Sequence, residues 1–258
     1  MRFPDSQRVT YERTPLVEVI CQLRYSKILR IEKEVPSEFQ DSIRSEYPRL
    51  EISKGIEVAM PMGSDAPPIA LSRGQSYDFW DKERAWKLVL TSDFIALSTN
   101  SYTKWEVFRK RLTTAVDALA QRYGVSEFTR VGLRYKDVVI RNDLNLGGRQ
   151  LRDLLRHDFM GILASDQFEE NDFQEALSII AFSLDDDIGE CRVRHGLARK
   201  PDSEDIGYLI DADFYNENST ETANVMDTLD AYNREAGRLF RWCISDDLHE
   251  AMGPTPIP

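Results

Sequence analysis

Alternating hydrophobic and polar positions mark the first element of the chain, residues 15–25 (PLVEVICQLRY). Every second position in this segment is hydrophobic: Val17, Val19, Cys21 and Leu23. The positions between them are mostly polar, as Glu18 and Gln22 illustrate. Because successive side chains of a strand point to opposite faces, this pattern predicts a half-buried β-strand.

The same alternation recurs along the chain and predicts further strands. They are expected at residues 76–80, 85–91, 94–99, 128–140, 174–184, 190–197 and 207–214. Residues 54–75 are rich in Gly and Pro, which favours short strands or a long loop. The run of aspartates at 185–187 predicts a turn between two of the strands.

Hydrophobic residues at helical spacing predict two long amphipathic helices. The first is expected to begin at a capping box in residues 103–106 (TKWE) and to end at Gly124. The second is expected at about residues 220–243, with a capping pair in residues 218–221 (NSTE). The last residues, 254–258 (PTPIP), predict a loose tail.

Each half of the chain therefore has antiparallel strands followed by one long helix. Strands and helices that segregate in this way indicate an α+β fold with an antiparallel sheet. We expect a curved sheet that carries both long helices in a pseudo-duplicated, helix-grip-like arrangement. The halves are residues 1–141 and 142–258, which form either two domains or one domain with a single continuous sheet.

Charge is distributed unevenly between these halves. The 258 residues include 33 Lys and Arg and 44 Asp and Glu, a net charge of −11. Residues 1–141 hold 23 basic and 19 acidic side chains (net +4), whereas residues 142–258 hold 10 and 25 (net −15). A nucleic-acid partner is disfavoured, because such binding depends on basic residues that neutralise phosphates. The opposite charges of the two halves favour self-association or packing of the halves on each other. The simpler interpretation is that both halves are solvated surfaces of one domain.

Cysteine usage and hydropathy predict a cytoplasmic protein. Cys21, Cys191 and Cys243 lie far apart without CxxC spacing, which fits a reducing compartment. No apolar run approaches the roughly 20 residues of a membrane helix. The N-terminus lacks the apolar stretch of a secretory signal.

Motifs that would carry chemistry are absent from the sequence. It contains no phosphate-binding glycine loop, nucleophile elbow or HExxH zinc motif, so no cofactor is expected. Asp211 and Asp213 lie two apart on a predicted strand, so both carboxylates share one face and are weak candidates for a Mg²⁺ site. Charge on the polar face of a strand is the simpler interpretation.

Several arginines share strand faces and form a candidate anion site. Arg192 and Arg194 lie on one face of their strand, and Arg134 and Arg24 lie on the polar faces of two others. If these strands are neighbours, their guanidinium groups would gather where phosphate or carboxylate could bind. The alternative is a set of cross-strand ion pairs on an exposed face, each worth under about 1 kcal/mol.

Three segments resemble an uncharacterised prokaryotic protein family of sporadic distribution. They are the opening PLVEVICQLRY, the helix start YTKWEVF and the strand GLRY. Two positions after Tyr135, where the family often has Asn, this chain has Asp137. The resemblance implies an accessory gene of mobile-element, toxin–antitoxin or antiviral neighbourhoods. It supplies no catalytic residues, but Arg134 and Tyr135 match its motif, which adds Tyr135 to the candidate binding residues.

Two classes of function follow as hypotheses. The first is a non-enzymatic binding protein that recognises a protein partner, a second copy of itself as a homodimer, or a small anionic ligand. The second is a metal-dependent hydrolase of a phosphate ester or nucleotide, in which Asp211 and Asp213 would hold Mg²⁺ while Arg134, Arg192 and Arg194 would bind the phosphate.

Overall fold

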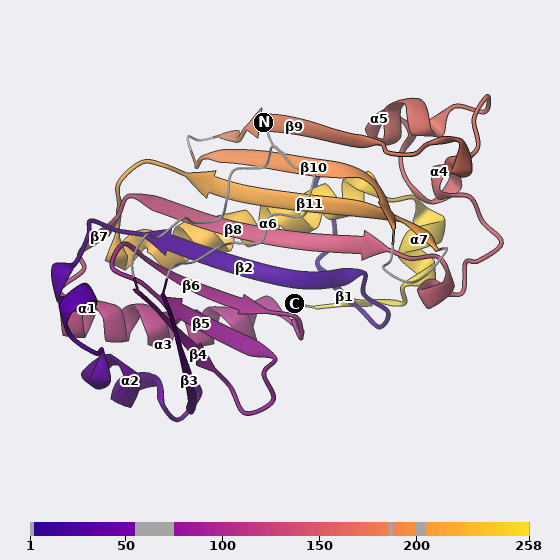
Figure 1. Cartoon of the computed structure of the whole chain (residues 1–258). Coiled ribbons are helices and arrows are strands. Elements are labelled where there is room, and N and C mark those ends of the chain that lie inside the picture. The colour runs from indigo at the N-terminus through magenta and orange to yellow at the C-terminus, as the bar shows by residue number, and fades with distance from the viewer. Residues whose placement is uncertain (1–2, 55–74, 186–187, 200–204, 258) are drawn as a thin grey trace. The chain divides into compact units, whose positions relative to one another are not determined.

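A computed structural model describes residues 3–54, 75–185, 188–199 and 205–257. Its main feature is an open antiparallel sheet of nine strands (Figure 1). In pairing order these are β3 (Arg49–Lys54), β4 (Gln75–Trp80), β5 (Trp86–Leu90), β6 (Phe94–Thr99), β2 (Leu16–Arg24), β8 (Arg130–Val139), β11 (Ile206–Asn216), β10 (Glu190–Arg199) and β9 (Leu177–Ser183). The chain is therefore α+β with an antiparallel sheet, as the segregated elements predict.

The remaining elements are α-helices, several short 3₁₀ helices and two short strand pairs. The helices are α1 (Leu29–Lys33), α2 (Ser37–Ile43), α3 (Trp105–Tyr123), α4 (Leu151–Leu154), α5 (His157–Met160), α6 (Val225–Cys243) and α7 (Asp246–Ala251). The strand pairs are β1 (Val9–Tyr11) with β13 (Pro254–Pro256), and β7 (Glu127–Phe128) with β12 (Thr220–Glu221). No helix in the described ranges combines the length and apolar character needed to cross a membrane.

Two compact units divide the chain. The terminal unit consists of Met1–Val17, Tyr135–Phe214 and Ala231–Pro258. The central unit consists of Glu18–Arg134 and Tyr215–Asp230. Each unit thus combines segments that are distant in sequence, and β2, β8, β11 and α6 each have residues in both.

The core of the central unit forms where β2 and α3 bury their hydrophobic faces. Cys21 and Leu23 of β2 are fully buried, as the alternation predicts. Phe108 of α3 is also fully buried, and its ring centre lies 5.7 Å from that of Trp86 on β5. The helix ends at Gly124, whose φ of 71° is the left-handed conformation that glycine adopts without strain.

The core of the terminal unit forms between β11 and the second half of α6. Tyr208 and Phe214 of β11 are fully buried. The ring of Phe214 packs 6.3 Å from that of Tyr232 on α6, which is buried as well. Strand alternation and helical spacing therefore identify these core residues.

Helix starts and the C-terminal tail differ from the sequence predictions. Lys104, rather than Thr103, is the N-cap of α3, and its side chain forms no capping hydrogen bond. The predicted start of the second long helix is wrong, because Thr220–Glu221 pairs with β7 and α6 begins five residues later at Val225. The tail is not loose, because Pro254–Pro256 pairs with β1.

Two predicted segments lie outside the described residues. They are most of the Gly- and Pro-rich segment (residues 55–74) and two aspartates of the turn (residues 186–187).

Candidate functional site

Arg194, a member of the predicted arginine cluster, forms a buried ion pair in the terminal unit. Its Nη2 donates to the Oδ2 of Asp211 at 3.0 Å, and the two residues are 6% and 4% exposed. Strand alternation places Arg192 on the face of Arg194 and Asp213 on the face of Asp211. A guanidinium that is buried against a carboxylate is already neutralised, so Arg194 is a poor receptor for another anion.

Arg24 and Arg134 belong to the central unit. Arg24 lines a hollow of about 360 Å³ together with Arg130, and the guanidinium of Arg130 lies 4.9 Å from the ring centre of Tyr215. Arg134 is half-buried on β8. Tyr135 follows it on the opposite face and is buried in the terminal unit, where its hydroxyl accepts a hydrogen bond from Asn233 on α6 at 2.8 Å. The candidates are thus divided between the units, with Arg24 and Arg134 in the central unit and Tyr135, Arg192 and Arg194 in the terminal unit.

The candidate metal ligands Asp211 and Asp213 gain no support from the geometry. Arg194 already occupies one carboxylate oxygen of Asp211. Among the residues that the structure describes, no group of three or more His, Cys, Asp and Glu side chains is placed to hold a metal ion. The hydrolase hypothesis therefore stays a prediction from the sequence.

His195 is a buried side chain that is held by a hydrogen bond and by ring stacking in the core of the terminal unit. Its Nδ1 hydrogen-bonds with the hydroxyl of Tyr208 at 2.8 Å, and its ring stacks on Phe159 with 3.9 Å between centres. The imidazole is 3% exposed, and this burial lowers its pKa to about 4. His195 is therefore a neutral core side chain near pH 7.

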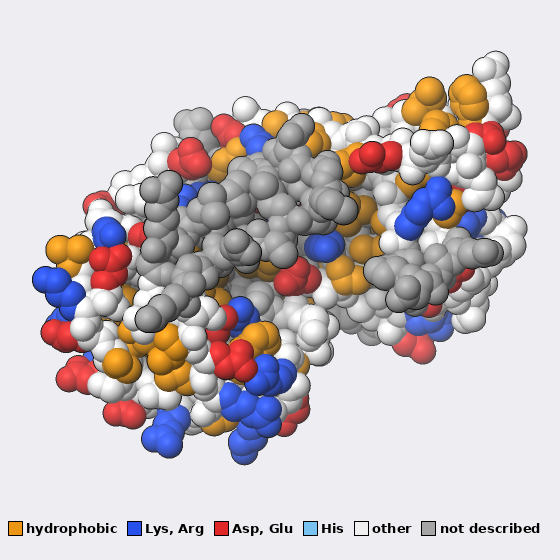
Figure 2. All heavy atoms as spheres, viewed as in Figure 1, with side chains coloured by type: hydrophobic (Ala, Val, Ile, Leu, Met, Phe, Trp, Pro, Cys, Tyr) orange, Lys and Arg blue, Asp and Glu red, His pale blue; other side chains and the backbone are white. Residues whose placement is uncertain are grey.

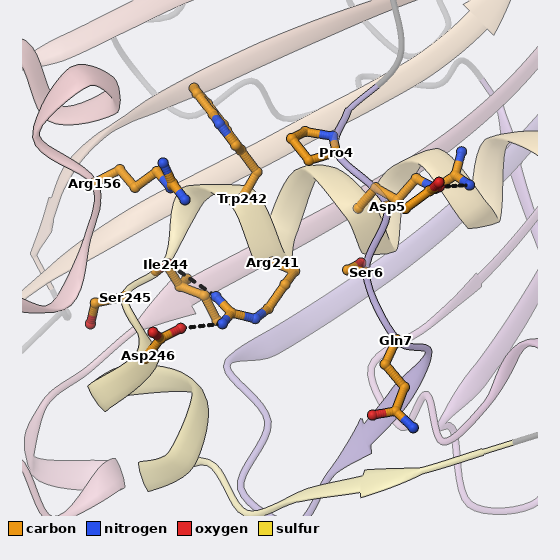
Figure 3. A pocket seen from close by; sticks show the side chains of 11 residues that line it. Pro4, Asp5, Ser6, Gln7, Arg156, Arg241, Trp242, Ile244, Ser245 and Asp246 are labelled. Atoms are coloured by element: carbon orange, nitrogen blue, oxygen red, sulfur yellow. Dashed lines mark hydrogen bonds and ion pairs between the residues drawn. The ribbon is translucent and has the colours of Figure 1, made fainter.

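A second arginine group, which the sequence analysis did not identify, surrounds a hollow in the terminal unit (Figure 3). The hollow has a volume of about 480 Å³. It is lined by residues 4–7, by Arg156, and by side chains from the end of α6 to the start of α7. We call it the arginine hollow, because Arg156, Arg238 and Arg241 all contribute to its wall.

Backbone pairing brings these arginines together from distant parts of the sequence. Arg238 and Arg241 lie three residues apart on α6 and so share one side of that helix. Arg156 lies between α4 and α5, and its backbone N–H donates to the carbonyl of Cys243 at 2.9 Å. The adjacent bridge between Leu155 and Ile244 fixes the same junction. Figure 3 shows Arg156 extending from this junction toward the end of α6.

Two of the three guanidinium groups have carboxylate partners, of which Asp5 and Asp246 are exposed and Glu235 is buried. Arg238 contacts Asp5 and lies 2.6 Å from Glu235, and Arg241 contacts Asp246. The hydrogen bond from Arg241 lowers the pKa of Asp246, which stays ionised. The side chains of Asp5 and Asp246 are 88% and 87% exposed, so water screens both pairs strongly.

Arg156 differs from both of them. It is exposed, and no carboxylate in the described ranges lies within ion-pair distance of it. Its guanidinium carbon lies 5.9 Å from the ring centre of Trp242, in the range of a cation–π contact. Arg156 therefore forms no ion pair within the described ranges, although its charge helps to lower the pKa of Asp246, which also lines the hollow.

Trp242 gives the arginine hollow a rigid aromatic wall. Its indole packs edge-to-face on Phe159, with 6.0 Å between ring centres, and lies 6.3 Å from Phe3. Phe3 and Phe159 are 2% and 3% exposed, so the indole rests on buried side chains. The hollow thus combines guanidinium donors with a flat apolar surface, a combination that binds an anionic group attached to a ring.

Comparison with known proteins adds no family: no family model matches the sequence, and no curated protein matches it. The geometry of the arginine hollow is therefore the basis for assigning a function.

Proposed function

We propose that this protein is a non-enzymatic binding protein for a small organic anion, and that the arginine hollow is its binding site. The observation that carries the proposal is Arg156, a guanidinium without a direct carboxylate partner among the described residues, beside the indole of Trp242. The ligand class is a phosphate or carboxylate joined to a flat ring. An accessory role in a defence or toxin–antitoxin system stays a hypothesis that rests on the family resemblance alone.

Size and charge support this ligand class. A volume of about 480 Å³ falls within the roughly 300–1,000 Å³ of small-molecule sites. Arg156 and Arg241 can each present two N–H groups to one anionic group, which is the geometry that phosphate and carboxylate prefer. Asp246 is exposed and can turn into solvent when an anion replaces it on Arg241.

The test is calorimetric titration of the full chain with three probes at low ionic strength. Inorganic phosphate carries only the charge, benzoate carries a ring and a carboxylate, and adenosine monophosphate carries a larger ring system and a phosphate. We expect adenosine monophosphate to bind most tightly, because it can contact both Arg156 and Trp242. Added salt should weaken binding of all three probes.

Variants identify the site. Arg156→Ala should weaken adenosine monophosphate binding about tenfold or more, since it removes charge-assisted hydrogen bonds. Trp242→Phe should weaken it less and leave phosphate binding unchanged. Arg234→Ala is the matched control, because Arg234 is an exposed arginine of α6 that does not line the hollow. The proposal is wrong if no probe binds, or if the variants at Arg156 and Arg234 have equal effects.

A further inference from the structure

Strand β9 forms one edge of the nine-stranded sheet. It pairs with β10 in a continuous register from Leu177 with Gly196 to Ser183 with Glu190. Within the described ranges, no strand pairs with its outer side (Figure 1). One row of backbone N–H and C=O groups therefore faces outward, and such a row is a template for a further strand.

This edge lacks the features that normally prevent strand pairing. Its sequence, LSIIAFS, contains no charged residue, no Pro and no Gly. Leu177 and Ile179 are 37% and 46% exposed. Along the upper margin in Figure 2, where Figure 1 places β9, hydrophobic side chains lie at the surface beside a few charged ones. Proteins usually protect exposed edges with charges, prolines or bulges, so β9 is an unprotected edge.

The opposite edge of the same sheet is protected. Strand β3 (RLEISK) carries Arg49 and Glu51 within the strand, and Arg84 forms an ion pair with Glu51. The two edge strands of the sheet thus differ in charge. A further strand that pairs with β3 would meet charged side chains, whereas one that pairs with β9 would meet an uncharged strand.

We infer that β9 pairs antiparallel with the β9 strand of a second copy, forming a homodimer with a sheet that continues across the two-fold axis. The strand is complementary to itself when the axis passes through Ile180. In that register Leu177 meets Ser183 and Ile179 meets Ala181, while Ser178 meets Phe182. Each large side chain thus faces a small one, except at Ile180, which faces its own copy.

Charge permits pairing along β9 but opposes contact beyond its ends. The chain has a net charge of −11, which opposes self-association in general. The uncharged strand brings no like charges together along its seven residues. At its ends the same register places Glu175 across from Asp185, and both are exposed. These like-charged pairs limit the contact to β9 and make the dimer stronger when salt screens them.

Sedimentation velocity of the full chain over a range of micromolar concentrations tests the inference. We expect a reversible dimer, twice the 29.8 kDa of one chain, whose fraction rises with protein concentration and with salt. Ile179→Lys should abolish it, because it places a charge beside the axis in both copies. Ile52→Lys is the matched control on β3, where Ile52 is 50% exposed, and it should leave the dimer unchanged.

The register has its own test. In Ile180→Cys the two engineered thiols meet at the axis, so mild oxidation should link the copies covalently, whereas the wild-type cysteines are buried and should not react. Thermal unfolding of each variant shows that it is folded. The inference is overturned if the chain is monomeric throughout, if Ile52→Lys and Ile179→Lys act alike, or if Ile180→Cys fails to cross-link.

Discussion

Asp137 is a buried carboxyl group that makes the stability of the fold depend on pH. It is 8% exposed on β8, and burial, together with the nearby carboxylate of Asp211, raises its pKa to about 8. In the unfolded chain the same group loses its proton near pH 4, as an ordinary solvated Asp side chain does. Between these values the folded state holds more protons than the unfolded state. The free energy of unfolding should therefore fall with rising pH, by up to about 1.4 kcal/mol per unit.

Asp137→Asn removes this ionisation while keeping the size of the side chain. We expect it to raise the free energy of unfolding at pH 8, to change it little at pH 4, and to flatten the slope between them. Urea denaturation across this pH range measures the effect. Asp117→Asn is the control, because Asp117 is exposed on α3. A wild-type slope near zero, or an unchanged slope in Asp137→Asn, would contradict the assignment.

Candidate site residues were predictable at this scale where they share a strand face. Strand alternation places Arg192 and Arg194 on one face of β10, and the ion pair between Arg194 and Asp211 lies on that face. Arg156 was not predictable. It reaches the end of α6 through backbone pairing of residues 154–156 with residues 243–245, and a pairing between residues this distant leaves no periodic pattern in the sequence.

At the scale of elements, two glycines should respond oppositely to substitution by alanine. Gly196 of β10 has a φ of 154°, and a Cβ there would lie 2.0 Å from the carbonyl oxygen of Ala176. Gly237 lies in α6, where a Cβ would meet nothing within 4 Å. Gly196→Ala should therefore lower the free energy of unfolding by about 2–4 kcal/mol. Gly237→Ala should raise it by about 1 kcal/mol, because alanine favours the helix.

Chemical denaturation of both glycine variants measures these changes. Each variant is the control for the other, since both add a single methyl group to the terminal unit. A Gly196→Ala protein as stable as wild type would show that β9 and β10 do not approach as closely as the structure places them.

Elements were predictable where burial repeats along the chain, and so was the end of α3 at Gly124, whereas the starts of the two long helices were not. Strand β2 and helix α3 each bury one face, so a period of two or of three to four residues reveals them. The short strands β12 and β13 bury little and exist through partners far away in sequence. The capping motif in residues 103–106 fails for a related reason, since local residue types do not fix where a helix begins once tertiary contacts compete.

At the scale of the whole molecule, the three thiols report whether its units open together. Cys21 lies in the central unit, Cys191 and Cys243 lie in the terminal unit, and all three are buried. Burial also raises the pKa of Cys191 and Cys243, so their reactive thiolate forms are rare. A thiol reagent should therefore label none of them in the native protein.

Because three strands of the sheet and α6 have residues in both units, we expect a denaturant to expose all three thiols in one kinetic phase, at the rate of global unfolding. Stopped-flow labelling of wild type and Cys21→Ser measures this, and a faster separate phase that disappears in Cys21→Ser would show that the central unit opens alone.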